Sequence, residues 1–434
     1  MLKRILAVAL SSVMVMSLVG CGGGAKDTAG QPAKSSDGKT VIKFFHRWPN
    51  EPRNSYFKEL VAEFEKQNPD IKVETDAVLN DSYKEKIRVL VSSDNVPDVF
   101  VSWSDSFAEN LVASGKVKPL NDIVEKDKEW ASQVMDSQKG AFTFDGKLYG
   151  MPLTIDGKAF FYNKDVFEKN GLSVPKTFDE LIALLEKLKT LGYKAPIIEG
   201  LTDPWTIAHY LGTMNQRMLE PAVLKKDYNA KTGEFTDPAY VKVLEHFKTL
   251  TKYMGTTATA IDHETARNMF ASGEVPVMYM QLAEIKKVQD NGDIKFGFFN
   301  FPTFADGKGS PEALTGAPEG FMLSNVSKNP EAAEKLLKFI ISKENATKFT
   351  KLDGQVTAIK GAVSADNASK EILEAVDLIM NSSETTPWLD NAVKISVADA
   401  YMRGGQSIAA GQKTPQDVMK DVQKAAAEER KSAK

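Results

Sequence analysis

VIKFFHRWPNEPRNSYFKELVAEFEKQNPDIKVETDAVLNDSYKEKIRVLVSSDNVPDVFV, residues 41–101, carries the clearest structural signal in the chain. β-Branched and aromatic residues predict strands over 41–45, 71–74 and 99–101. Apolar residues at helical spacing predict helices between them, over 57–64 and 83–91. A strand-helix-strand-helix-strand order is typical of a doubly wound parallel sheet, so we expect an α/β protein.

The same alternation returns later in the chain. Strands are predicted over 160–162, 275–279 and 296–301, and a Gly/Pro-rich loop over 302–318. One helix, 178–191, has an N-cap signal at Thr177 and a stop at Gly192. Further helices are predicted over 240–253, 330–342, 369–380, 395–410 and 415–429. After an export signal is removed, about 400 residues remain, which suggests two domains.

The N-terminus predicts export and lipid attachment. Two basic residues precede an apolar run over 5–19, which is too short for a membrane span of about 20 residues. Leu18-Val19-Gly20-Cys21 resembles the bacterial lipobox, in which cleavage precedes the cysteine and its thiol takes a diacylglyceryl group. Cys21 is also the single cysteine of the chain. We favour an anchor of two acyl chains over a buried or unpaired thiol.

Composition excludes several other classes. Residues 22–40 are mostly Gly, Ser, Ala, Lys and Asp and show no apolar periodicity, which predicts a flexible tether. The net charge of −3 comes from nearly balanced charges and argues against nucleic acid. The sequence has no phosphate loop, no zinc-binding His-Glu motif and no Gly-x-Ser-x-Gly elbow, so we expect no cofactor and no metal.

A series of segments resembles the family 1 extracellular solute-binding proteins of ABC transporters. The most specific are GKLYGMP at 146–152, FYNKDVF at 161–167 and GLSVPKTFDEL at 171–181. Supporting segments occur in family order at 95–100, 269–278, 316–321, 329–333 and 411–415. Together they cover nearly the whole mature chain.

This resemblance implies a two-lobed, type II periplasmic-binding-protein-like fold with the ligand in a cleft between the lobes. We expect a signal peptide at 1–20 and a tether at 21–40. The first lobe is expected to comprise 41–153 with 301–353, and the second 154–300 with 354–434. The hinge crossings are therefore expected near 153–155, 300–302 and 353–355.

Sugar binding calls for aromatic rings against C–H faces and planar polar groups against hydroxyls, just beyond strand ends. Trp48 and Arg53 follow the first strand, and Trp103 and Asp105 end the third. We predict that all four contact the ligand. Core packing for the tryptophans and a solvated surface charge for Arg53 are the alternatives.

Other candidates come from the resemblance. Asp156 follows the Tyr-Gly-x-Pro turn at the first crossing, where the family often supplies a carboxylate. Trp205 matches the aromatic platform of the second lobe, with a helix-start tryptophan as the alternative. Trp388 and Asp390 resemble a Trp-Asp-Gln stretch ahead of the final helices.

The sequence leaves the role of two further candidate ligand-binding residues open. Gln281 stands where the family has Gly-x-Trp, so either a platform is lost or a polar group replaces it. Glu319 lies in the loop that matches the family's Gly-Gly turn.

The sequence thus predicts a non-enzymatic, extracytoplasmic, lipid-anchored binding protein. It would capture a sugar, with an oligosaccharide favoured by the tryptophans, and deliver it to the permease of an ABC importer. We expect a monomer. A lipidated glycoside hydrolase is the alternative, because carboxylates are plentiful.

Overall fold

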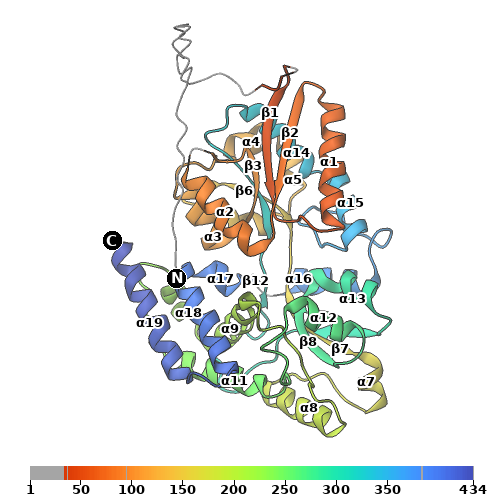
Figure 1. Cartoon of the computed structure of the whole chain (residues 1–434), viewed down its shortest axis with the longest axis vertical. Coiled ribbons are helices and arrows are strands. Elements are labelled where there is room, and N and C mark those ends of the chain that lie inside the picture. The colour runs from red at the N-terminus through yellow and green to blue at the C-terminus, as the bar shows by residue number, and fades with distance from the viewer. Residues whose placement is uncertain (1–33, 37, 94, 383–384, 434) are drawn as a thin grey trace, which may run out of the picture.

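The computed structural model describes residues 34–36, 38–93, 95–382 and 385–433. The predicted signal peptide, Cys21 and residues 22–33 of the predicted tether lie outside this range. The described chain forms two lobes, joined by crossing segments in the middle of the molecule (Figure 1). Among the helices of the described chain, none combines the length and the apolar character that a membrane span requires.

The first lobe is built on a five-stranded sheet of order β2-β1-β3-β11-β6. Its strands are β1 (Thr40–His46), β2 (Ile71–Ala77), β3 (Val99–Trp103), β6 (Gly150–Thr154) and β11 (Glu319–Leu323). β1, β2 and β3 are parallel, as the alternation of strands and helices predicted, whereas β11 is antiparallel to both neighbours. β3 is buried throughout because it lies in the middle of the sheet, between β1 and β11, and packs against α3 and α14.

Helix α1 shows why these sequences fold as they do. It spans Arg53–Gln67, and its apolar positions Phe57, Leu60, Val61 and Phe64 are all buried against the lobe. The other elements of this lobe are α2 (Asn80–Ser92), α3 (Asp105–Val112), α4 (Asn121–Lys126), α5 (Lys128–Ser132), α6 (Asp136–Lys139), η1 (Gly140–Phe142), β4 (Thr143–Phe144), β5 (Lys147–Leu148), α14 (Pro330–Ile340) and α15 (Lys343–Asp353).

The second lobe has a three-stranded sheet of order β8-β7-β9 and a two-stranded sheet of β10 and β12. These strands are β7 (Lys158–Asn163), β8 (Val277–Gln281), β9 (Phe296–Phe299), β10 (Leu314–Thr315) and β12 (Thr385–Thr386). The helices are α7 (Lys164–Lys169), α8 (Phe178–Thr190), α9 (Pro204–Met218), α10 (Pro221–Asp227), α11 (Ala239–Thr251), α12 (His263–Ala271), η2 (Leu282–Glu284), α13 (Ile285–Asn291), α16 (Lys370–Asn381), α17 (Leu389–Ala392), α18 (Ile395–Ala409) and α19 (Pro415–Ser432).

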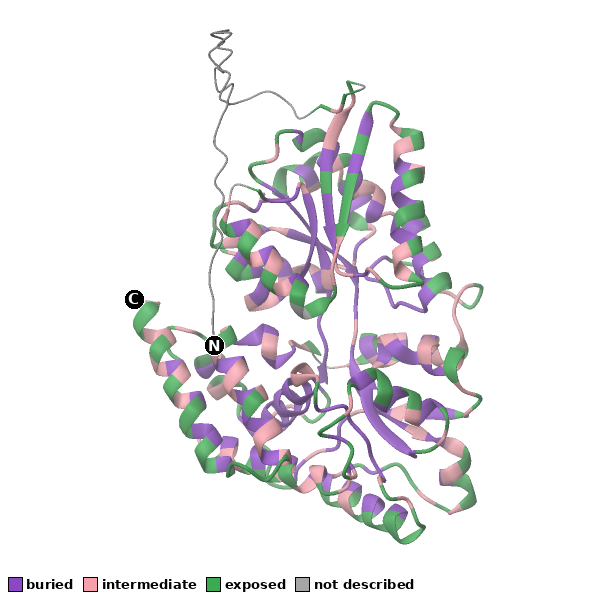
Figure 2. Ribbon diagram, in the orientation of Figure 1, coloured by how far each residue is buried: buried purple, intermediate pink, exposed green. Residues whose placement is uncertain are grey.

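Two helices of this lobe, α8 and α9, differ in how well local sequence signals predicted them. The Thr177 cap of α8 is present as a full capping box with Glu180, so that helix begins where the sequence predicted. The sequence pattern did not predict α9, because Thr206 to Met218 are buried on every side and the helix has no exposed face to set against an apolar one. Figure 2 shows α9 as the mostly buried centre of the lower lobe.

The first crossing, between β6 and β7, lies at 155–157, close to where it was expected. The second was expected at 300–302 but lies at 316–318, between β10 and β11. Residues 301–313 therefore pack on the second lobe, where the Arg217 guanidinium donates to the carbonyls of Ser310 at 2.6 Å and Ala313 at 2.7 Å. At Gly316 a Cβ atom would lie 2.0 Å from the Asp156 carbonyl oxygen, so the two crossings pass each other at a point that requires glycine.

The third crossing was expected at 353–355 and lies between Lys360 and Ser369. Residues 356–360 stay with the first lobe, since the Ile155 amide donates to the Val356 carbonyl and the Ala358 amide donates to the Leu153 carbonyl. The second lobe resumes at Ser369, whose hydroxyl accepts a hydrogen bond from Gln289. At the other end of the chain, Lys34 pairs with Thr40, so the last part of the predicted tether contacts β1.

Candidate functional site

A cleft of about 490 Å³ lies between the lobes. The first lobe contributes residues that follow β1 and β2 and one at the start of β11, because these strand ends share one edge of the sheet. The second lobe contributes the end of β8, residues of η2, the first turn of α13 and the starts of α9 and α12. Both walls are polar and carry many charges.

The Arg47–Glu319 pair forms part of the first wall. The Arg47 guanidinium donates to both Glu319 carboxylate oxygens, at 2.6 and 2.7 Å from Nη2 and 3.0 Å from Nε. Glu319 is opposite Trp103 in the β11–β3 register, which brings it beside the end of β1. Arg47 lies over the rings of Trp48, at 5.1 Å, and Trp103, at 4.9 Å.

Three first-lobe candidates differ in how they are placed relative to the cleft. Trp48 reaches the cleft but is only 6% exposed, and its ring stacks on Phe57 at 4.8 Å, so most of it belongs to the core. Trp103 does not line the cleft; it supports Arg47 from beneath. Asp105 does not line it either, and its carboxylate accepts a hydrogen bond from the Ser104 hydroxyl at 2.6 Å.

Arg53 does line the cleft, as predicted, but it is not a free charge. Its Nε donates to the Asp353 carboxylate at 2.5 Å, and the two side chains are 14% and 3% exposed. Because Asp353 ends α15, this pair fixes the start of α1 against the neighbouring helix.

Asp156 and Gln281 meet at the floor of the cleft. The Gln281 amide donates to one Asp156 oxygen at 2.7 Å, while the backbone amides of Gly157 and Ala283 donate to the other at 2.8 and 3.1 Å. Burial nevertheless raises the pKa of Asp156 to about 7, against the lowering effect of these hydrogen bonds. Gln281 thus presents a polar side chain at the cleft, where the sequence left a lost platform and a polar replacement both open.

Trp205 and Trp388 both line the cleft from the second lobe. Trp205, in the first turn of α9, is half-buried and meets the edges of His209 and His263 with ring centroids 5.0 and 4.7 Å apart. Trp388 is 4% exposed and stacks on His209 at 4.0 Å. Of the tryptophans in the cleft, Trp205 has the most ring surface open to a ligand.

A chain of buried charges lies behind Trp205. His263 joins Glu199 through Nδ1 and Glu284 through Nε2, both at 2.8 Å, and Arg267 joins Glu284 at 2.8 Å. The flanking carboxylates raise the pKa of His263 to about 9 despite its burial, so it is a cation at neutral pH. Lys158, fully buried, lies 3.8 Å from Glu199 and 5.3 Å from the centre of the Trp205 ring.

Asp390 is placed differently from its prediction. It does not line the cleft but pairs with Lys84 of the first lobe at 2.9 Å, with the two side chains 8% and 17% exposed. Close by, the Ser106 hydroxyl of α3 donates to the carbonyl of Ala392 in α17. Asp390 therefore joins the lobes in this arrangement.

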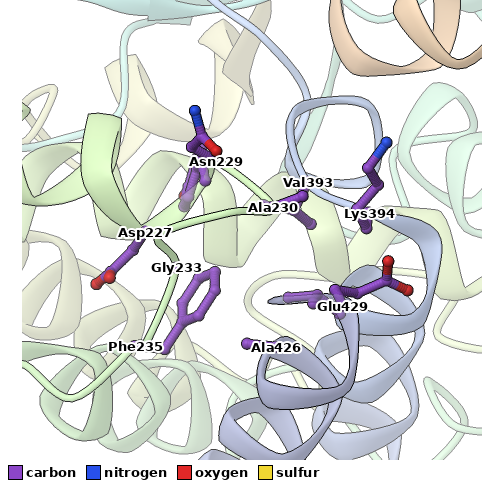
Figure 3. Close-up of a pocket in the computed structure, with 11 residues that line it drawn as sticks. Asp227, Asn229, Ala230, Gly233, Phe235, Val393, Lys394, Ala426 and Glu429 are labelled. Atoms are coloured by element: carbon purple, nitrogen blue, oxygen red, sulfur yellow. The ribbon is translucent and has the colours of Figure 1, made fainter. Parts of the chain in front are cut away.

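A second hollow, between the 227–235 loop and helices α18 and α19, is shown in Figure 3. Its volume is about 10 Å³, roughly the space that one water molecule needs, so no sugar fits it. Within the part of the chain that the structure describes, no group of three or more His, Cys, Asp or Glu is arranged to hold a metal ion.

Sequence reasoning missed Arg47, Lys158, Glu199, His263, Arg267 and Glu284. Their partners lie between 17 positions away, for Arg267 and Glu284, and 272 positions away, for Arg47 and Glu319. No local motif marks them, and only the pairing of distant strands and helices brings them together.

The family model for bacterial extracellular solute-binding proteins matches residues 48–347. The chain belongs to this family. The family predicted from the sequence segments is thereby confirmed, and the family is extracellular. Several relatives are likewise binding proteins. An ABC transporter extracellular-binding protein of Pyrococcus horikoshii is 27% identical over 403 residues, covering 90% of each chain.

The multiple sugar-binding protein of Streptococcus mutans is 26% identical over 343 residues, covering 76% of this chain and 77% of its own. Among solved structures, a chitin oligosaccharide binding protein superposes with a TM-score of 0.80 at 22% identity, over 91% of this solute-binding protein and 99% of the other chain. This likeness confirms the two-lobed fold.

Proposed function

We propose that this solute-binding protein captures a sugar, most suitably an oligosaccharide, in the cleft between its lobes. The observation that carries the proposal is Trp205, whose partly exposed side chain lines a cleft of about 490 Å³ with polar groups on both walls. That volume is within the range of small-ligand sites. Relatives named for multiple sugars and chitin oligosaccharide give further support.

The ligand would act by shifting the population of lobe arrangements, because only a closed cleft lets it touch Trp205 and the Arg47–Glu319 wall together. The closed form would then deliver the sugar to the permease subunits of an ABC importer. Cys21, if lipidated, would hold this monomeric protein at the outer face of the membrane. In this function the protein is not an enzyme.

A panel of mono- and oligosaccharides, measured by calorimetry and followed by chromatography of each mixture, tests the proposal. Saturable binding with unchanged sugars is the expected result. Sugar fragments that accumulate with time would favour the glycoside hydrolase instead. A panel in which no sugar binds would contradict both.

A further inference from the structure

Helix α17 touches both lobes. It is fixed to the second lobe, because Leu389 is fully buried there and a Cβ atom on Gly212 of α9 would lie 3.0 Å from the Leu389 Cβ atom. It also contacts α3 of the first lobe, and Figure 1 shows α17 directly below α3. The helix is therefore a part of the second lobe that is placed against the first.

The central contact between them is the ion pair of Lys84 and Asp390. The Lys84 ammonium donates to Asp390 at 2.9 Å, and the two side chains are 17% and 8% exposed. The first lobe holds this ammonium group in place, because it lies 4.7 Å from the centre of the Trp103 ring and 5.9 Å from that of Phe107. The second Asp390 oxygen accepts no hydrogen bond across the part of the chain that the structure describes. His209 lies 3.9 Å from that oxygen, but burial lowers its pKa well below the usual value, so it supplies no charge.

Two hydrogen bonds accompany the ion pair. The Ser106 hydroxyl of α3 donates to the Ala392 carbonyl at 2.9 Å, and the Lys394 ammonium donates to the side-chain oxygen of Asn110 in α3. All three contacts join residues 390–394 of the second lobe to α2 and α3 of the first. Because they are so close along the chain, separation of the lobes at this point would break them together.

These contacts adjoin the cleft without lining it. Trp388, two residues before Asp390, and Ser82, two residues before Lys84, both line the cleft, whereas no residue of the three contacts does. A sugar in the cleft therefore leaves the contacts free to form. They can hold the lobes together whichever sugar is bound.

We propose that these three contacts act as a latch, which stabilises the closed arrangement of the lobes and so contributes to the affinity for every sugar without touching one. Whatever favours the arrangement that binds ligand raises the apparent affinity. Lys84 is the main member of the latch, since its loss leaves the Asp390 charge buried without a cation unless the lobes separate and water reaches it. This inference goes beyond sugar binding, because the latch acts on the lobes themselves.

The first test needs no sugar. Lys84→Met keeps the length of the side chain and removes its charge, so small-angle scattering should give a larger radius of gyration than for the parent. Asp390→Asn keeps the shape of its side chain, should change the radius in the same direction, and decides the question if Lys84→Met does not fold. Lys86→Met is the matched control, because Lys86 is on the same helix but pairs with Asp76 within the first lobe at 2.5 Å. Its radius should equal that of the parent.

Calorimetry with sugars gives the second readout. Lys84→Met should weaken every sugar that the parent binds by the same factor, about threefold or more, which is within the range of coupled pairs. Asp390→Asn added to Lys84→Met should weaken binding little further, because either substitution alone already breaks the ion pair. Lys86→Met should bind as the parent does.

An unchanged radius in the sugar-free latch variants, with thermal unfolding showing that they are folded, would overturn the latch. A loss of affinity that differs from sugar to sugar would also overturn it, since Lys84 would then contact the ligand. Equal effects of Lys84→Met and Lys86→Met would do the same, because the charge of α2 rather than the ion pair would be responsible. If the parent binds no sugar, the proposed sugar-binding function fails, and the scattering comparison still decides the latch.

Discussion

Single side chains in the cleft have separable tasks. Trp205→Ala should weaken every bound sugar by about 2–4 kcal/mol, the range of a central aromatic contact. Because Trp205 is half-buried at the start of α9, we expect only a small change in melting temperature. Calorimetry and thermal unfolding check this, with Trp205→Phe, which keeps an aromatic ring, as the control. A large fall in melting temperature with normal affinity would instead assign Trp205 to the core.

Asp156 should make stability depend on pH. Its pKa is raised from 3.8 to about 7, so between these values the folded protein holds more protons than the unfolded chain, and stability falls as pH rises. The side chain of Asp156→Asn cannot titrate. Without ligand, the change in unfolding free energy with pH should therefore be smaller in the variant than in the parent by on the order of 2–4 kcal/mol. Denaturant unfolding from pH 4 to 8 measures it. If the unfolding free energy changes equally with pH in the parent and in the variant, the prediction is refuted.

At the scale of elements, buried charges join α12 to the segment after β8. His263 and Arg267, four residues apart on α12, both contact Glu284 in η2. The carboxylates raise the pKa of His263 from 6.5 to about 9, so its contribution to stability is complete below pH 6.5 and is lost as pH rises toward 9.

His263→Gln should therefore lower stability by about 3–5 kcal/mol at pH 6, because Glu199 and Glu284 lose their shared cation. By pH 9.5 the difference in unfolding free energy between the variant and the parent should have become smaller by about 3 kcal/mol. His246→Gln, on α11 and outside this chain of charges, is the control and should show no such narrowing. If this difference in unfolding free energy stays constant from pH 6 to pH 9.5, His263 is neutral in the folded protein.

For the whole molecule, the lobes should approach each other when the sugar binds. Small-angle scattering should give a smaller radius of gyration with saturating sugar, because the ligand contacts both walls only in a closed cleft. At the same subsaturating sugar concentration, the radius of gyration of Trp205→Ala should decrease less than that of the parent. An unchanged radius with binding verified would rule out closure.

The predicted anchor is also a property of the whole chain. Cys21→Ser should leave the protein folded, because residue 21 precedes the described lobes, and should release it from the membrane fraction. Fractionation after a high-salt wash checks this. A variant that still sediments with membranes would show that another contact holds it there.

Local signals in the sequence determined the strands and capped helices, and the order of short segments determined the family. The capping box at Thr177 and the apolar positions of α1 needed only neighbours within a few residues, so the sequence alone placed them. The resemblance to the family, rather than a local signal, singled out Trp205 and Asp156, and both residues line the cleft.

Tertiary structure alone decided which charges are free. Asp390 was predicted to bind ligand but is held by Lys84, 306 positions away, and Arg53 is held by Asp353, 300 positions away. Segment 301–313 followed the second lobe because Arg217 of α9 binds its carbonyls. Ion pairs and buried hydrogen bonds form through space, so their partners leave no periodic trace along the chain, and only the packed lobes determine them.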